Sequence, residues 1–154
     1  YFVPAFSGLF SPHWDETARG VLVGLSRFSN KSHIARAVLE SVAYQSYELL
    51  DSMEKDIEIN FESVNVDGGM VENNLLMQFQ SDIFNKKVNS QQINEITALG
   101  VGAASYIYFN NLPLDTMGEF ITNSQNWKPN MDSKQRDNYL AKWNKAISKA
   151  KQWT

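Results

Sequence analysis

The residues best placed for chemistry in this sequence are two adjacent glycines. The segment "VNVDGGMVENN", residues 64–74, carries an apolar strand pattern into Asp67-Gly68-Gly69 and then into an apolar helical pattern. A Cβ at such a strand-to-helix turn would hold a ligand away from the backbone or forbid a positive φ, and paired glycines remove both obstacles. A helix that starts after the turn would offer free N–H groups and the positive end of its dipole. The pattern predicts a place where another molecule lies against bare backbone.

Two side chains beside this turn extend the prediction. Asn73, one turn into the predicted helix, could hydrogen-bond a base or a ribose. Asp67 is the carboxylate at the turn, and we expect a structural role for it there. No lysine follows the glycines, so the turn is not a phosphate loop of the Gly-Lys-Thr kind. A tight turn without any ligand is the alternative, and the motif alone leaves both interpretations open.

Other residue types that could do chemistry are poorly arranged. His13 and His33 are far apart, and the sequence has no cysteine, so a zinc site is not expected. Asn30 opens a match to a glycosylation acceptor, but we interpret it as a helix N-cap. The pair Gly100 and Gly102 resembles the start of a dinucleotide fingerprint, yet it lies inside a helical pattern. We therefore expect no metal site here, and the spacing supports no Ser-His-Asp arrangement.

Composition limits the class of protein. The chain has 154 residues and a formal net charge of −3, which argues against a nucleic-acid partner because phosphate binding needs a positive field. No apolar run approaches the ~20 residues that a membrane-spanning helix needs. The absence of cysteine fits a reducing compartment, so we expect a cytoplasmic protein. The chain opens on Tyr1 in the middle of an apolar pattern, and we expect a fragment of a longer protein.

Periodicity predicts alternating strands and helices, which is an α/β layer architecture. Strands are expected in residues 1–6, 21–25, 61–67 and 86–90, with the second of these buried. Helices are expected from residue 31 over about five turns, at about 71–84, at 95–109, briefly within 112–121, and from about 133 to 150.

The expected helices also carry predicted faces. In the first long helix, the apolar stripe is expected to pack on the sheet. It consists of Ile34, Val38, Val42, Leu49 and Met53, and it is widened by Ala35, Leu39, Ala43 and Leu50. In the third, a small-residue face predicts close packing: Ala98, Gly102 and Ser105. In the last, Asp132 and Gln135 predict a capping box, and one side is apolar: Tyr139, Leu140, Trp143, Ile147 and Ala150. The basic residues of that helix predict a solvated face: Lys134, Arg136, Lys142, Lys145, Lys149 and Lys151.

One longer stretch resembles a family signature. The segment "GVLVGLSRFSNKSHIARAVLE", residues 20–40, is similar to the signature of the FGGY carbohydrate kinases. The matching positions are Gly20, Leu22, Gly24, Leu25, His33-Ile34, Ala37-Val38-Leu39 and Glu40. The stretches "PAFSGLFSPHW", "ESVAYQ", "VDGGMVENNLLMQFQSDI" and "TALG" are similar in order and spacing to the glycerol kinase branch of that family. The resemblance covers essentially the whole chain.

The resemblance implies a fold and a nucleotide site. Kinases of this branch have two actin-like lobes, each a ribonuclease H-like α/β fold with a mixed sheet flanked by helices, and ATP and glycerol bind between them. Residues 1–154 would be the C-terminal lobe, with the N-terminal lobe absent. On matching positions, Gly69 and Asn73 correspond to nucleotide-contacting residues, with Gly68 and Met70 as neighbours.

The resemblance also implies what this chain lacks. The family's catalytic aspartate, its phosphate-binding loops and its glycerol-binding residues lie upstream of the matched region. We therefore expect the chain alone to be inactive, with Mg²⁺ bound mainly by the missing lobe. The implied partners are ATP or ADP, glycerol, the N-terminal lobe and further subunits in a homodimer or homotetramer. Two alternatives stay open, namely a non-catalytic nucleotide-binding or interaction domain of the same fold, and the lobe of a related xylulose or gluconate kinase.

Overall fold

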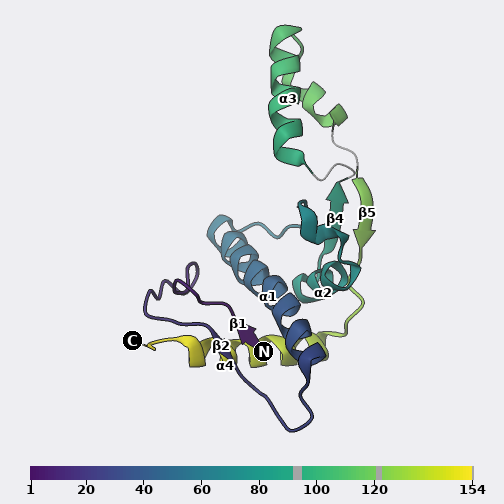
Figure 1. The fold of residues 1–154 in the computed structure, drawn as a ribbon. Coiled ribbons are helices and arrows are strands. Elements are labelled where there is room, and N and C mark those ends of the chain that lie inside the picture. Colours follow the sequence, from purple (N-terminus) through teal and green to yellow (C-terminus); the bar gives the residue numbers. More distant parts are fainter. Residues whose placement is uncertain (92–94, 121–122, 154) are drawn as a thin grey trace.

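The structure is a computed structural model that describes residues 1–91, 95–120 and 123–153. Strands and helices alternate along it, which confirms the predicted α/β architecture (Figure 1). The strands are β1 (Phe2–Val3), β2 (Val21–Leu22), β3 (Ser63–Val66), β4 (Lys87–Gln91) and β5 (Asn123–Trp127). The α-helices are α1 (Lys31–Ile57), α2 (Asn74–Phe84), α3 (Ile96–Phe109) and α4 (Ser133–Ala150), and the 3-10 helices are η1 (Gly69–Glu72) and η2 (Leu114–Phe120).

The main sheet is mixed, as the resemblance implied. Its strand order is β3-β4-β5, with β3 parallel and β5 antiparallel to β4. Val88 of β4 is fully buried and stands opposite Val64 on one side and Trp127 on the other. Strand β5 was not expected, because its segment "NSQNW" is polar and shows no apolar alternation. Backbone pairing with β4, which side-chain patterns do not report, makes it a strand.

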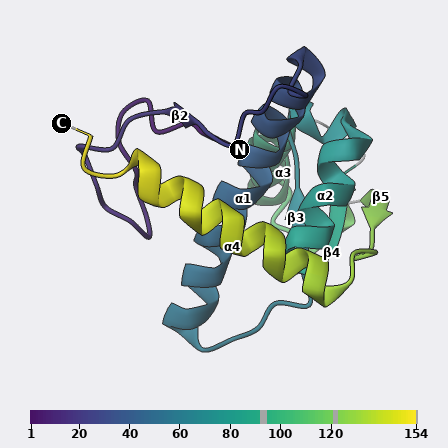
Figure 2. The same ribbon diagram turned by 90° about the horizontal axis from the view of Figure 1, so that it is seen from below.

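The core lies where α1, α2 and α4 meet. Tyr44 of α1 and Trp143 of α4 are both fully buried, and their rings stack with centroids 4.8 Å apart. Phe79 of α2 meets Tyr44 edge-on at 5.5 Å. Seen from below, α4 crosses the α1–α2 layer (Figure 2). Aromatic contacts of this kind add to the area that each ring buries, so the three helices are joined at one point.

Helix α1 begins where the sequence predicts but turns a different face inward. Asn30 is the N-cap, and its side-chain oxygen accepts hydrogen bonds from the N–H groups of Ser32 and His33. The predicted burial of the apolar stripe is wrong, because Ile34, Val38, Leu49 and Met53 are 39–49% exposed. The helix packs on α2 and β1 through the side that carries Ala43 and Tyr44. Val42 of the stripe packs partly against the core, and of the residues expected to widen the stripe Ala43 is buried and Leu50 packs against the core.

Of two short apolar segments, one differs from expectation and one agrees with it. The predicted strand at residues 21–25 extends over Val21 and Leu22 only, where the chain pairs with β1. Gly24 has a φ of +82°, which turns the chain away, and Leu25 is exposed. The prediction of a buried strand there is therefore wrong. In contrast, the short helix expected within 112–121 is η2, although residue 121 lies outside the described residues.

Helix α3 has the predicted bounds but not the predicted packing. Figure 1 shows it standing away from the layer formed by α1, α2 and α4, and its main contacts are with η2. Ala98, Gly102 and Ser105 are exposed, and within the described residues nothing lies within 4 Å of a Cβ placed on Gly102. The expected close packing of this small-residue face is therefore not found in this chain.

Helix α4 follows its prediction in its start and its buried side, and of the predicted capping box the structure gives the bond to the Asp132 side chain. The Asp132 side chain caps it by accepting a hydrogen bond from the Gln135 N–H, and Trp143, Ile147 and Ala150 are buried. Arg136, expected on the solvated face, instead donates from Nε to the Ile83 carbonyl oxygen at 2.7 Å. Among the described residues, no helix combines the length and the apolar character that crossing a membrane requires.

Candidate functional site

The turn after β3 is built around one glycine with a positive φ. Gly68 has φ +89° and ψ 173°, a backbone region that is essentially restricted to glycine. Its carbonyl oxygen accepts a hydrogen bond from the Val71 N–H at 3.1 Å, which closes the 3-10 turn η1. Val71 is buried and anchors the turn on the core. The chain thus reverses within four residues and presents its backbone at the carboxyl end of the sheet.

The second glycine keeps the surface open. Gly69 shows no positive φ, so its backbone conformation does not require glycine. Nothing in the described chain lies within 4 Å of a Cβ placed on Gly68 or on Gly69. Met70, beside them, is 48% exposed. The open backbone surface expected from the sequence is present, and a side chain at Gly69 would project into it.

The helix after the turn begins later than predicted. Its first turn was expected near Val71, with Asn73 one turn inside; instead η1 intervenes and Asn73 is the N-cap of α2. The Asn73 Oδ1 accepts a hydrogen bond from the Leu76 N–H at 3.1 Å. This part of the prediction is wrong, because the α-helix N-terminus is displaced from the glycines. With Oδ1 used as the cap, the Nδ2 group of Asn73 is the donor that another molecule could use.

Charge at the turn disfavours phosphate. Asp67 and Glu72 flank the glycines, and residues 63–76 contain no lysine or arginine. A negative local field repels phosphate groups and tolerates an uncharged ligand surface. The turn is therefore better suited to the neutral end of a phosphorylated molecule than to its charged end.

A hollow of about 250 Å³ adjoins the turn at the carboxyl ends of β3 and β4. Its lining residues are Asn65 and Val66 of β3, Asp67 after it, Gln91 at the end of β4 and Ile96 at the start of α3. Ligands of open α/β sheets bind outside the carboxyl ends of parallel strands, so the position is consistent with a binding site. Sequence reasoning missed Gln91 and Ile96, because only the parallel register, with Val66 opposite Ser90, brings them to the turn.

Metal ligands do not gather in the part of the chain that the structure describes. Over residues 1–91, 95–120 and 123–153, no three side chains of histidine, aspartate or glutamate are grouped so that they could hold a metal ion. Divalent cations such as Mg²⁺ need oxygen ligands from several carboxylates, carbonyls or phosphates.

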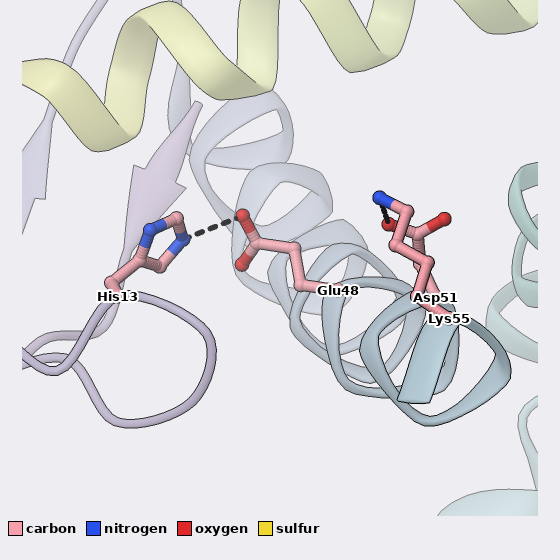
Figure 3. Close-up of polar contacts among 4 residues, drawn as sticks. All are labelled: His13, Glu48, Asp51 and Lys55. Atoms are coloured by element: carbon pink, nitrogen blue, oxygen red, sulfur yellow. Dashed lines mark hydrogen bonds and ion pairs between the residues drawn. The ribbon is translucent and has the colours of Figure 1, made fainter. Parts of the chain in front are cut away.

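A contact between two polar side chains, His13 and Glu48, was not predicted from the sequence. His13, in the loop before β2, places Nε2 2.8 Å from Oε1 of Glu48 on α1 (Figure 3). The two side chains are only 16% and 11% exposed. Thirty-five positions separate them, so no local spacing could indicate the contact. The Lys55–Asp51 pair on the same helix, also in Figure 3, is more exposed and joins residues one turn apart.

Comparison with known proteins gives a consistent family. A model of the C-terminal domain of the FGGY family of carbohydrate kinases matches residues 1–106. A curated glycerol kinase from Azorhizobium caulinodans is 45% identical over 99% of this chain, and one from Clavibacter michiganensis is 46% identical over 99%. The chain spans only 31% and 30% of the length of these two relatives.

Solved structures agree with the sequence comparison. A Plasmodium falciparum glycerol kinase with ADP superposes with a TM-score of 0.87 at 36% identity, over 97% of this chain and 30% of that one. A gluconate kinase from Lactobacillus acidophilus gives a TM-score of 0.74 at 25% identity, over 96% of this chain and 30% of that one. The mixed sheet with flanking helices is thus shared with solved kinases of this kind.

Proposed function

Because the chain belongs to the FGGY family of carbohydrate kinases, we propose that residues 1–154 are the C-terminal, nucleotide-binding lobe of an ATP-dependent glycerol kinase. The observation that carries the proposal is 45–46% identity to glycerol kinases along 99% of the chain. The superposition with a glycerol kinase that contains ADP supports it. The full-length enzyme would transfer the γ-phosphoryl group of ATP to a hydroxyl of glycerol, giving glycerol 3-phosphate and ADP.

The nucleotide would lie on the turn after β3. The adenosine end of ATP fits against the open backbone of Gly68 and Gly69, where a Cβ would meet nothing of the chain itself. Met70 offers an exposed apolar side chain next to it, and Asn73 offers its Nδ2 donor to an acceptor on the base or ribose. The Asp67 carboxylate would keep the phosphates away from this turn and toward the rest of the enzyme.

The remaining functions are assigned to the part of the protein outside this chain. Phosphoryl transfer depends on positioning and on charge stabilisation by Mg²⁺ and fixed donors. We assign the catalytic base, most Mg²⁺ contacts and the glycerol site to the N-terminal lobe, which is the first partner of this one. The full-length enzyme is further proposed to be a cytoplasmic homodimer or homotetramer. Gluconate is a second candidate substrate, because 96% of this chain superposes on the gluconate kinase structure with a TM-score of 0.74.

The proposal is tested with the full-length protein that carries this chain. A coupled assay should detect ADP formation that depends on glycerol and ATP, with little turnover of xylulose or gluconate. Turnover of xylulose or gluconate instead would assign the lobe to a related sugar kinase. ATP binding by calorimetry without any turnover would make it a non-catalytic nucleotide-binding domain. If neither turnover nor ATP binding is detected, the proposed nucleotide site is refuted.

A further inference from the structure

The segment before β2 forms a rigid loop beside α1. Leu9 and Asp15 exchange two backbone hydrogen bonds, each 2.8 Å long. Gly8 has a φ of +95°, and a Cβ there would stand 2.8 Å from the Asp15 carbonyl oxygen. The Asp15 carboxylate also accepts a hydrogen bond from the Thr17 hydroxyl at 2.6 Å. This loop is therefore held in one shape before any ligand arrives, which lowers the entropic cost of binding.

A hollow of about 270 Å³ lies between this loop and α1. Its apolar side includes the rings of Phe6 and Phe10, which are 75% and 69% exposed. Its polar side includes Ser11, His13, Gln45 and Glu48. Gly68, Gly69, Met70 and Asn73 do not border it. The hollow is thus separate from the proposed nucleotide turn, and it combines exposed aromatic rings with convergent polar groups, as ligand sites do.

The polar side of the hollow is organised by the His13–Glu48 contact. In Figure 3 the imidazole reaches from the loop toward the carboxylate on α1, with Nε2 and Oε1 2.8 Å apart. This contact uses Oε1 and leaves Glu48 Oε2 able to accept another hydrogen bond. Gln45 precedes Glu48 by three positions, so both side chains lie on one face of the helix. The amide of Gln45 adds both a donor and an acceptor.

These groups select the chemistry of a ligand. An apolar side chain of a partner would strip water from Glu48 and His13 without replacing the lost hydrogen bonds. An anion would meet the Glu48 carboxylate. An uncharged molecule with hydroxyl donors meets neither problem, because it replaces the lost hydrogen bonds and carries no charge to be repelled by the carboxylate. The C–H groups of such a molecule would lie on the rings of Phe6 and Phe10.

We propose that this hollow binds a small uncharged polyhydroxy compound, a polyol or a monosaccharide, at a site distinct from the kinase chemistry. The hollow has a volume of about 270 Å³, whereas an engineered cavity of about 150 Å³ accommodates benzene, so a molecule of this size fits. Hydroxyl groups would donate to Glu48 Oε2 and exchange hydrogen bonds with Gln45 and Ser11. The proposal does not depend on the enzyme being a glycerol kinase.

The test is saturation-transfer NMR on the full-length protein with xylitol and glucose as probes. Glu48→Gln removes the charged acceptor, and Phe10→Ser removes an exposed aromatic wall without disturbing the core. Each should weaken probe binding about tenfold, the effect of losing one good contact. The matched controls are Glu40→Gln, which removes another ion-paired carboxylate of α1, and Phe28→Ser, which removes an exposed ring outside the hollow.

The outcomes distinguish a polyol site from a protein contact and from a hollow that binds nothing. The controls should bind the probes like the parent, and none of the four variants should change turnover at saturating substrates. Equal probe signals in all five proteins, or no signal in the parent, would overturn the proposal. A Phe10→Ser variant with altered molecular mass by light scattering, together with absent probe binding, would show that the loop is a protein contact and would overturn it too. If the protein lacks kinase activity, the binding comparison is still decisive.

Discussion

Gly68 and Gly69 are adjacent, yet each is a glycine for a different reason. Gly68 adopts a φ of +89°, which an L side chain rarely tolerates, so its role is conformational. Gly69 has no such constraint, and its missing side chain leaves open surface. Replacement of Gly69 therefore tests ligand approach without straining the backbone.

We expect Gly69→Val in the full-length enzyme to raise the KM for ATP by about tenfold or more, because the valine side chain would project into the surface assigned to adenosine. A factor of ten corresponds to about 1.4 kcal/mol of lost binding. The KM for glycerol should not change. Gly118→Val is the matched control, since Gly118 also has nothing within 4 Å of its Cβ position and lies on η2, away from the turn. Steady-state kinetics with circular dichroism checks both. An unchanged KM for ATP in a folded Gly69→Val enzyme would make the turn purely structural.

The Asp15 carboxylate is a single residue that is expected to make the stability of the folded protein depend on pH. The hydrogen bond from the Thr17 hydroxyl, with backbone N–H groups adding to it, holds the pKa of Asp15 below its usual value despite partial desolvation. Such a group stabilises the folded state above its unfolded pKa of about 3.9, and this contribution is lost as pH falls through the lower, folded pKa.

We therefore expect Asp15→Asn to lower the Tm of the full-length protein at pH 7, with the difference shrinking as the pH approaches about 3, below the unfolded pKa. Thermal unfolding followed by circular dichroism at both pH values measures this. The neighbouring Glu16→Gln, at an exposed position, should leave the Tm unchanged at both. A difference for Asp15→Asn that stays constant across this range would show that the carboxylate charge is not what stabilises the loop.

At the scale of elements, the contact between α1 and α4 holds the core. Tyr44 and Trp143 are fully buried and stacked, whereas the stripe of α1 that periodicity predicted to be buried is about half exposed. The burial of Tyr44 also raises the pKa of its hydroxyl, because the phenolate would lose its hydration. The helix orientation therefore depends on one aromatic side chain more than on the aliphatic stripe.

We expect Tyr44→Ala to lower the free energy of unfolding by roughly 3–5 kcal/mol, the range for deleting a large buried aromatic side chain. Tyr108→Ala, at an exposed position of α3, should cost much less than that in this chain. Urea denaturation followed by tryptophan fluorescence gives both values. Equal losses for the two variants would contradict the observed orientation of α1.

At the scale of the whole molecule, we propose that this chain is one lobe of a larger kinase. It spans 30–31% of its relatives, and α3 leaves several apolar side chains exposed: Val101, Tyr106, Tyr108 and Phe109. A helix that is apolar around its circumference is normally buried. Phosphoryl transfer also needs charge stabilisation by Mg²⁺ and fixed donors, which we assign to the part of the enzyme outside this chain.

We expect residues 1–154, expressed alone, to show no glycerol-dependent ATP turnover. The coupled assay used for the full-length enzyme measures this, with the full-length protein as the positive control. Co-expression with the upstream part should restore turnover if the two parts reassemble. Turnover by the isolated lobe would place the catalytic machinery in this chain and refute its assignment to the N-terminal lobe.

Local signals in the sequence were enough for most helices and for the glycine turn after β3. The caps at Asn30 and Asp132 and the strand-to-glycine transition at Gly68 could be read directly, because capping and turn formation involve residues that are near neighbours. The family signature extended this to the fold class. For the same local reason, the start of α2 was misplaced by a few residues, since a 3-10 turn and an α-helix share much of their pattern.

Tertiary structure decided which surfaces are covered and which distant residues meet. Periodicity marks an apolar stripe on α1, but only the neighbouring helices select the face with Tyr44 as the buried one. The polar strand β5 exists because its backbone pairs with β4. His13 meets Glu48 because a rigid loop folds against α1. Each of these depends on contacts between parts of the chain that are far apart in sequence, and neither side-chain spacing nor local propensity encodes such contacts.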